Sequence, residues 1–317
     1  MARNGFRPTV VERAQGLRSS GSPVDVRGPA VAIADRMGLM PRLRSAGTAA
    51  RTLTFRNAHD REDGDGDGVE VTFDRSAPRR FGLVVGADGL HSATRRLAFG
   101  PEASFVRHMG VYVATVSLGG AAASDTEILM YNAPGSAVSI HPSRGTALAA
   151  FMFRSPAIAD FDYKDTAQHR RLLEAAFGGG GWRLPELLSR VRDADDLYFD
   201  AVSQVVLPRW STGRVALLGD AASCVSLFGD GSSLAMAGAA TLAESLAASG
   251  DISLALRRYE AEHRRLTNPK QRNVAQAAAM LIPSTRAGLI ARNAATRLWP
   301  LAAAATWTGR KLTHEAA

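Results

Sequence analysis

The sequence has very little cysteine and no long apolar run, and both absences limit what kind of protein it is. Cys224 is the single cysteine, so no disulfide can form within the chain, which is typical of a reducing compartment. The longest apolar stretch, near residues 298–307, is too short to span a bilayer. Residues 1–14 carry charges and lack the apolar block of a secretory signal. We therefore predict a cytoplasmic protein with no membrane partner.

A basic stripe is also absent, although the chain carries a net charge of +8. The basic residues are nearly all arginine and are spread along the chain, with acidic residues between them. Nucleic-acid-binding domains instead gather basic residues on one face, so we predict a solvated surface and no nucleic-acid partner.

The 317 residues, 46% of them hydrophobic, are enough for two globular domains.

Hydrophobic patterning alternates between strand-like and helix-like segments. Strand patterns occur at residues 9–11, 51–55, 69–73, 81–86 and 214–218. Helical spacing occurs at residues 29–39, 168–177, 184–191 and 232–248, and over much of 252–311. Residues 110–155 hold several alternating segments separated by Pro, Gly and Ser, which predicts an antiparallel sheet inserted between two α/β halves.

A polar loop imitates half of a calcium site. The aspartates and glycines of residues 63–68 match the first half of an EF-hand loop, and Asp74 falls where the bidentate glutamate should be. An EF-hand needs a helix on both sides, whereas residues 69–73 alternate like a strand, and Asp-Gly repeats favour turns. We therefore predict a solvated loop and no metal site.

Residues 213–222 (GRVALLGDAA) place Gly219 and Asp220 at the carboxyl end of a predicted buried strand, where open α/β sheets bind ligands. Residues 224–236 (CVSLFGDGSSLAM) then bring Gly229 and Gly231 to the start of a predicted helix. Glycine lets the backbone approach a ligand, and free helix-start amides favour anionic or electron-rich atoms. A capped strand-turn-helix alone would explain Gly219 and Asp220, but the whole stretch indicates a ligand site.

Together with residues 83–95 (LVVGADGLHSATR), this stretch resembles FAD-dependent monooxygenases of the para-hydroxybenzoate hydroxylase type, in the branch that acts on aromatic and polyketide compounds. The resemblance implies that Asp220 bonds a ribitol or ribose hydroxyl and that amides around Gly231 face the flavin. It makes Asp88, Ser92 and Arg95 the polar members of a motif between the flavin and reductant regions. The aspartate that usually opens this strand is Gly82 here.

The start of the chain carries the resemblance as well. Residues 9–14 (TVVERA) are similar to the end of a second Rossmann strand, which implies that Glu12 bonds the adenosine ribose; a plain surface acid is the alternative. Arg27, within residues 22–29, would lie near the flavin. The resemblance implies no catalytic side chain, because FAD carries the chemistry, with NAD(P)H as reductant and O2 as the oxygen source.

The glycine loop that should hold the pyrophosphate of FAD is not found in this sequence. A Rossmann fingerprint precedes the acid by about 20 residues, whereas only residues 1–11 precede Glu12, and the family also has a longer segment after Phe55. Three interpretations stay open. The chain is a shortened hydroxylase, or a non-redox relative that uses the old substrate pocket for binding or cofactor-free cyclisation, or a chain whose sheet an associated chain completes.

The predicted fold is α/β, a partial Rossmann-like FAD-binding domain with an inserted antiparallel substrate sheet and C-terminal helices. The FAD-binding part covers residues 1–105 and 201–260, the substrate sheet 106–200 and the C-terminal helices 261–317. The predicted function is an FAD-dependent monooxygenase that uses NAD(P)H and O2 on an aromatic or polyketide-like small molecule. Nothing in the sequence indicates an oligomeric state.

Overall fold

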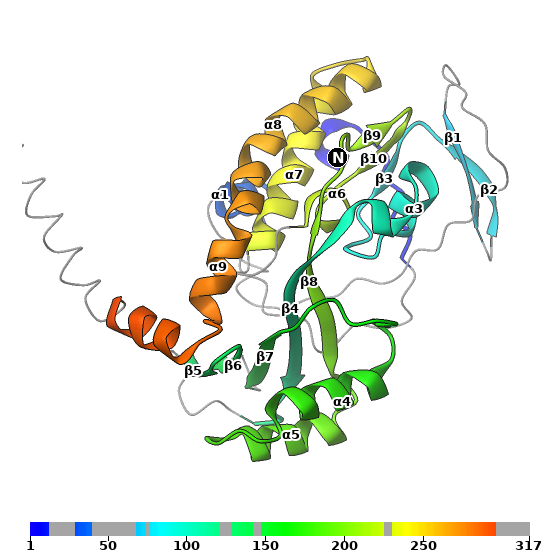
Figure 1. The fold of residues 1–317 in the computed structure, drawn as a ribbon. Coiled ribbons are helices and arrows are strands. Elements are labelled where there is room, and N and C mark those ends of the chain that lie inside the picture. Colours follow the sequence, from blue (N-terminus) through cyan, green and yellow to red (C-terminus); the bar gives the residue numbers. More distant parts are fainter. Residues whose placement is uncertain are drawn as a thin grey trace, which may run out of the picture. The chain divides into compact units, whose positions relative to one another are not determined.

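The computed structural model describes residues 1–12, 29–39, 68–73, 76–120, 128–141, 147–224 and 230–295. The chain divides into two compact units, whose elements are labelled in Figure 1. The first unit comprises Met1–Met109 and Val202–Val274, and the second comprises Gly110–Ala201 and Ala275–Ala317. The mixture of helices and sheets confirms the predicted α/β class. Residues 63–67 and Asp74 of the calcium-like pattern lie outside the described residues, and so does the predicted strand at 51–55.

The first unit combines short strands with long helices. Its strands are β1 (Val69–Phe73), β2 (Ser76–Phe81), β3 (Val84–Gly86), β9 (Ser211–Thr212) and β10 (Val215–Leu217). Its helices are η1 (Ala2–Asn4), α1 (Pro29–Arg36), α3 (Ala93–Phe99), η2 (Glu102–Ser104), α6 (Asp220–Ser223), α7 (Asp230–Ala247) and α8 (Ile252–Arg272). Two further strands, β4 (Val106–Ser117) and β8 (Tyr198–Val205), contribute residues to both units.

A small sheet with the order β3-β10-β9 organises the first unit. β3 and β10 are parallel, with Val84 opposite Val215 and Gly86 opposite Leu217. The continuous strand predicted at 81–86 was wrong in one respect, because β2 ends at Phe81 and β3 begins only at Val84. The break separates two pairings, since β2 pairs with β1 in a different sheet.

The strand predicted at residues 9–11 is not formed. Glu12 makes an isolated bridge, and Val10 is 87% exposed. The described part of this unit holds the sheets β3-β10-β9 and β1-β2, and residues 9–11 belong to neither of them. A run of three β-favouring residues does not form a strand without a paired neighbour, because its backbone hydrogen bonds are then made to water.

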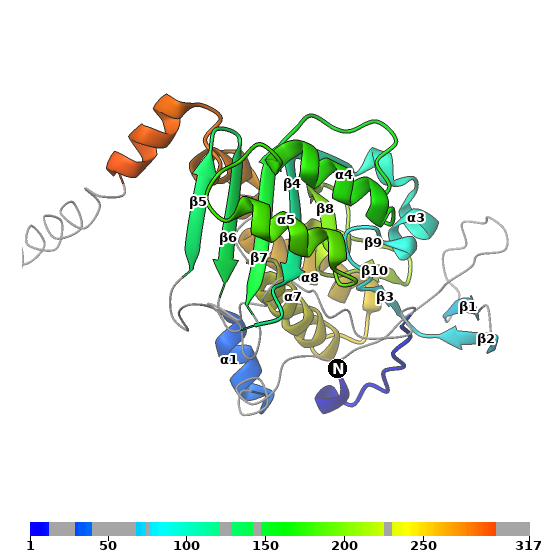
Figure 2. The same ribbon diagram turned by 90° about the horizontal axis from the view of Figure 1, so that it is seen from below.

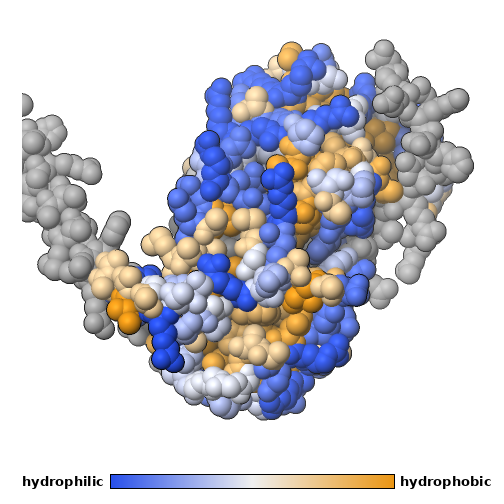
Figure 3. Space-filling model, viewed as in Figure 1, coloured by the Kyte–Doolittle hydropathy of each residue, from blue (hydrophilic) through white to orange (hydrophobic). Residues whose placement is uncertain are grey.

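Helices α7 and α8 lie side by side in the first unit (Figure 1). The buried side chains of α8 share one face, because from Leu256 onwards they recur every three or four residues. They are Ala255, Leu256, Tyr259, His263 and Thr267. The Tyr259 hydroxyl donates to the Leu217 carbonyl at 3.0 Å, which ties α8 to β10, while the outer side of α8 is predominantly hydrophilic (Figure 3). We predicted that the FAD-binding part ends at residue 260 and that the C-terminal helices begin at residue 261. In the structure α8 continues through both residues, so no helix or strand ends there.

The second unit contains a five-stranded sheet covered on one face by two helices. Its other elements are β5 (Leu129–Ala133), β6 (Ser136–His141), β7 (Leu148–Arg154), α4 (Thr166–Phe177), α5 (Leu184–Asp193) and most of α9 (Val274–Leu281). The strand order is β5-β6-β7-β4-β8, and the pairs from β5 to β4 are antiparallel. Helices α4 and α5 cross one face (Figure 2). The antiparallel sheet predicted within residues 110–155 is confirmed.

The chain bends after α9, and the bend is fastened to the sheet of the second unit. Arg154 Nε donates to the Ile282 carbonyl at 2.6 Å, and Asn132 Nδ2 donates to the Leu281 carbonyl at 3.1 Å. Among the described residues no single helix is long and apolar enough to cross a membrane, and only the pair Val274–Leu281 and Arg286–Ala295, bent by 96°, meets those criteria jointly.

We expect the stability of the first unit to fall at mildly acidic pH because of His263. This side chain is 1% exposed, its Nδ1 has no hydrogen-bond partner in the described part of the chain, and burial lowers its pKa from 6.5 to about 4. The unfolded chain therefore binds the proton first. Neutral His263 makes its full contribution to the free energy of unfolding above pH 6.5. As the pH falls from 6.5 towards 4, the free energy of unfolding decreases by up to about 3 kcal/mol.

Denaturant unfolding of the wild type and of His263→Met between pH 7.5 and 4.5 measures this effect. His169 in the second unit also has a pKa lowered by burial, so the difference between the two proteins is the relevant quantity. The variant, which cannot take up that proton, should lose less stability on acidification. Equal pH dependence in both proteins would show that His263 does not contribute.

Candidate functional site

A pocket of about 220 Å³ opens at the carboxyl ends of the parallel strands β3 and β10. Its lining comes from the two turns that follow these strands and from the first turns of α7: Ala87, Gly89, Leu218, Gly219, Asp220, Gly231, Ser232 and Ala235. Three of the predicted cofactor-binding residues, Gly219, Asp220 and Gly231, therefore meet in one cavity. This is the edge at which open α/β sheets bind ligands.

A larger and more open hollow of about 340 Å³ lies elsewhere in the first unit. It is lined by Gln204, Val206, Asn268, Gln271 and Arg272. None of the predicted site residues contributes to it, and two of its lining residues, Gln204 and Gln271, are hydrogen-bonded to backbone carbonyls. The smaller pocket is therefore the candidate ligand site.

The turn after β10 is shaped by Gly219. Its backbone has φ +63°, a conformation that strains any residue with a side chain, and a Cβ at this position would lie 3.3 Å from the Ala235 Cβ. The turn leads directly into α6, which begins at Asp220. Burial raises the pKa of Asp220, and a hydrogen bond with the Cys224 side chain acts in the opposite direction. The glycine thus places a half-buried carboxylate at the pocket.

The donors and acceptors around the pocket fit part of an FAD molecule. Asp220 supplies a carboxylate that accepts hydrogen bonds from sugar-like hydroxyls, and the first turn of α7 supplies backbone amides that have no partner within the helix. Gly231 lies beside this carboxylate, since a Cβ built there would be in van der Waals contact with Asp220 Oδ1 at 3.6 Å. The volume is below the 300–1,000 Å³ of pockets for drug-sized ligands, so it accommodates one portion of the dinucleotide.

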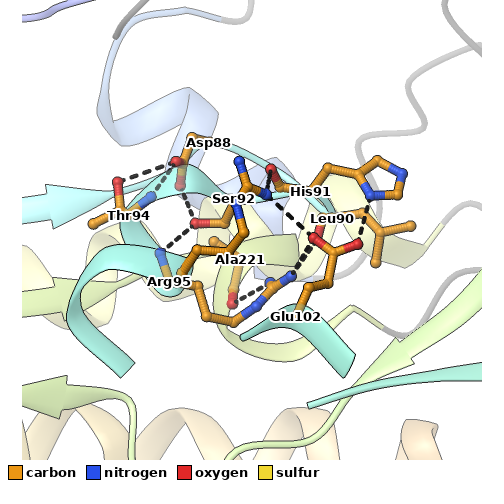
Figure 4. Close-up of polar contacts among 9 residues, drawn as sticks. Asp88, Leu90, His91, Ser92, Thr94, Arg95, Glu102 and Ala221 are labelled. Atoms are coloured by element: carbon orange, nitrogen blue, oxygen red, sulfur yellow. Dashed lines mark hydrogen bonds and ion pairs between the residues drawn. The ribbon is translucent and has the colours of Figure 1, made fainter. Parts of the chain in front are cut away.

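The Asp88 carboxylate is committed to the start of α3, as Figure 4 shows. Its Oδ1 accepts from the Ser92 hydroxyl at 2.5 Å, and its Oδ2 accepts from the Thr94 amide at 2.9 Å and the Thr94 hydroxyl at 3.0 Å. Ser92, as the N-cap, in turn accepts from the Arg95 amide. These contacts fix the turn after β3, and its Gly89 lines the pocket. In this structure Asp88 does not line the pocket but stabilises the turn that carries Gly89.

Arg95 joins the two motifs to each other. Its side chain is 0% exposed, and its guanidinium donates to the Ala221 carbonyl at 3.0 Å and to the Leu90 carbonyl (Figure 4). Burial lowers the pKa of Arg95, and the charges of Glu102 and Asp88 oppose that change. With no exposed surface, Arg95 cannot touch a ligand in this structure. It holds the turn after β3 against α6, the helix whose first residue is the pocket-lining Asp220.

Glu102, in η2, completes the cluster around Arg95. Its carboxylate accepts from His91 Nδ1 at 2.9 Å and pairs with the Arg95 and Arg96 guanidinium groups at 3.5 and 3.4 Å. Burial opposes ionisation of Glu102, but the hydrogen bond from His91 and the nearby positive charges outweigh it, so the pKa of Glu102 lies below its ordinary value. Sequence reasoning missed Glu102, because it follows the motif and belongs to no recognisable pattern.

The remaining predicted residues do not reach the pocket or cannot be located. Glu12 is exposed at its isolated bridge and does not line the pocket. Arg27 and Gly229 lie outside the described residues. Their roles in cofactor binding stay predictions. Within the part of the chain that the structure describes, no group of three or more His, Cys, Asp and Glu side chains is placed to hold a metal ion.

We expect Gly219→Ala to destabilise the first unit by roughly 1–3 kcal/mol, because the added Cβ forces a strained conformation and crowds Ala235. Gly82→Ala is the control, since its φ is not positive and its Cβ would meet open space, so that change should stay within about 0.5 kcal/mol. Denaturant unfolding measures both values. Equal stability of the two variants would contradict the strained turn.

Arg95→Met should destabilise the protein by about 3 kcal/mol, because it leaves two carbonyls and Glu102 without their buried donor. Arg96→Met is the matched control. Arg96 also pairs with Glu102, but its side chain is 42% exposed, so its loss should cost less than about 1 kcal/mol. Chemical denaturation of both variants at neutral pH tests the difference, and similar losses would show that Arg95 is not a structural link.

Comparison with known proteins agrees with the geometry of the pocket. A family model described as an FAD binding domain matches residues 17–271. An uncharacterised protein of Mycobacterium tuberculosis is 35% identical over 315 residues, covering 83% of this chain and 84% of the relative. A flavin-dependent monooxygenase of Legionella longbeachae is 30% identical over 322 residues, covering 86% and 82%.

A solved structure, that of tetracycline destructase Tet(51), superimposes with a TM-score of 0.77 at 26% identity, covering 92% of this chain and 89% of that chain. The family model spans both motifs that meet at the pocket, and several relatives, among them the one from Legionella longbeachae, are named as flavin-dependent monooxygenases. The chain therefore belongs to the FAD-dependent monooxygenases of the aromatic hydroxylase family, whose cofactor is FAD.

Proposed function

We propose that this monooxygenase takes reducing equivalents from NAD(P)H and uses O2 to oxygenate an aromatic or polyketide-like small molecule. The observation that carries the proposal is the meeting of Gly219, Asp220 and the α7 start in one pocket at the strand ends. The name of the Tet(51) neighbour gives tetracycline, a polycyclic polyketide, as what that protein acts on. This supports the same broad substrate class for the present chain.

FAD, when bound, supplies the redox chemistry, so the residues of the chain serve to bind and orient it. Asp220 accepts a hydrogen bond from a hydroxyl of the sugar-like chain, and the amides at the start of α7 donate to electron-rich atoms. Asp88 and Arg95 act indirectly, by holding the turns that carry Gly89 and Asp220. Glu12, Arg27 and Gly229 remain proposed contacts.

The sheet of the second unit is the proposed substrate-binding part. Val138 and Ile140 of β6 pack into the core beneath α4 and α5, so the alternate residues Ser139 and His141 point to the opposite face. There the Ser139 hydroxyl and His141 Nε2 are hydrogen-bonded at 2.8 Å. Ser139 is fully buried and His141 is half-buried, so His141 is the member of this pair that we propose meets a substrate with hydroxyl or carbonyl groups.

The visible spectrum of the purified chain and its titration with FAD test this function. We expect flavin absorbance, a saturable titration, and NAD(P)H oxidation that an aromatic or polyketide-like substrate stimulates. A colourless protein that FAD cannot saturate would contradict the proposal. Such a result would favour the second candidate, a non-redox relative that binds a small molecule or cyclises it.

Asp220→Asn should raise the dissociation constant of FAD by roughly 10- to 100-fold, because a hydrogen bond to a charged acceptor contributes about 1.5–3 kcal/mol. Glu262→Gln is the control, since it makes the same chemical change at an exposed ion pair with Arg258. Flavin fluorescence during titration of the apoprotein gives both constants. Unchanged affinity in Asp220→Asn would mean that this carboxylate does not hold the cofactor.

A further inference from the structure

The outer edge of β5 has no strand beside it in the described part of the chain. β5 comes first in the strand order β5-β6-β7-β4-β8, and Figure 2 shows it at the border of the five-stranded sheet. Its pairing with β6 uses one side of the strand, from Leu129 opposite Ile140 to Ala133 opposite Ser136. The amide and carbonyl groups on the other side are therefore available to a further strand.

Large apolar side chains are exposed along this edge. Ile128 is 55% exposed, Leu129 is 37% exposed and Met130 is 42% exposed. Leu129 and Met130 are neighbours within the strand, so their side chains point to opposite faces of the sheet. An extended segment that pairs with β5 would therefore cover apolar side chains on both faces.

Trp182 adds a fourth exposed apolar side chain, and its backbone is strained. Its ring stacks on Tyr131 of β5, with the ring centroids 5.6 Å apart and the planes inclined by 8°, yet the residue is 43% exposed. Its φ of +54° lies in the left-handed region, which costs a bulky residue about 1–3 kcal/mol. The fold thus holds a half-exposed indole against the edge strand, and tryptophan is enriched among the residues that dominate binding energies.

The edge strand lacks the residues that usually prevent such pairing. Natural edge strands are protected by charged side chains or proline, whereas residues 128–133 read ILMYNA, without Lys, Arg, Asp, Glu or Pro. A second copy of the chain brings the same uncharged strand, so pairing of β5 with β5 places no like charges opposite each other. Elsewhere the net charge of +8 opposes the association of two copies. Charge therefore favours self-association at this edge.

The exposed area is enough for a weak dimer. The four side chains, 37% to 55% exposed, can bury on the order of 100 Å² each, because a large side chain presents about 200 Å² when fully exposed. This is about half of the roughly 800 Å² per partner in a standard interface, and the backbone of β5 adds to it. We therefore expect dissociation in the micromolar range.

We propose that two copies of this chain associate through β5, with the two edge strands antiparallel and Trp182 of each copy packed beside the joined strands. A two-fold axis generates this antiparallel arrangement from two identical strands and gives a closed dimer. The two five-stranded sheets then become one continuous sheet, with antiparallel pairing like that from β5 to β4. The inference concerns assembly and does not depend on the proposed function.

Analytical ultracentrifugation of the full chain from about 1 to 100 µM tests the association. We expect the wild type to pass from monomer to dimer, and Leu129→Lys and Met130→Lys each to weaken dimerisation at least about tenfold, because each brings two like charges together. Leu254→Lys is the matched control, since it makes the same change at a residue of α8 that is 50% exposed. A wild type that stays monomeric, or a dimer that both β5 variants leave intact, would overturn the proposal.

Disulfide cross-linking locates the axis without adding charge. The axis places one residue of β5 directly opposite its own copy, with the Cβ atoms about 5 Å apart, whereas the residues on either side lie too far from their copies for a disulfide. The native Cys224 is buried, so an added cysteine on β5 reports on this contact. Under oxidising conditions, one of Leu129→Cys, Met130→Cys, Tyr131→Cys and Asn132→Cys should cross-link at least about tenfold faster than its neighbours. Equal rates at the four positions, or no cross-linking, would contradict pairing of β5 with itself.

Discussion

The parallel pairing of β3 with β10 is the constraint on which the ligand site depends. Because Gly86 lies opposite Leu217, both strands end at the same level, and the turns after them face the same space. The Leu218 amide donates to the Gly86 carbonyl at 2.8 Å and extends the pairing by one residue into the turn. Two segments separated by more than a hundred residues in the sequence thereby form one pocket wall.

Short strands alone would hold this arrangement weakly, and buried polar contacts reinforce it. A Cβ on Gly86 would come within 2.6 Å of the Thr94 side chain, so glycine is what allows α3 to pack directly on β3. Arg95 then connects α3 to the Ala221 carbonyl in α6. Tyr259 connects α8 to β10 from the other side. The pocket is therefore held by groups that never touch a ligand, and its shape depends on side chains behind it.

The two motifs contain polar residues with two different roles. Asp220 lines the pocket together with Gly219 and Gly231. Asp88 has both oxygens bonded to Ser92 and Thr94, which leaves it a structural task. The two aspartates follow the parallel strands β3 and β10. The Asp88 carboxylate is hydrogen-bonded at the start of α3 and has a structural role, whereas the Asp220 carboxylate lines the pocket and is available to a ligand.

The sequence by itself determined the α/β class, the antiparallel sheet of the second unit and the location of the ligand-facing turn at Gly219 and Asp220. These features follow from hydrophobic periodicity and from glycine next to a carboxylate at a strand end, which are local signals. Only the tertiary structure showed that Arg95 is buried and that Glu102 pairs with it. It also showed that residues 9–11 form no strand. A strand needs a neighbouring strand to pair with, and the hydrophobic pattern of a segment does not reveal whether one is present. Burial and pairing are set by which elements meet in space, and spacing along a chain does not encode that.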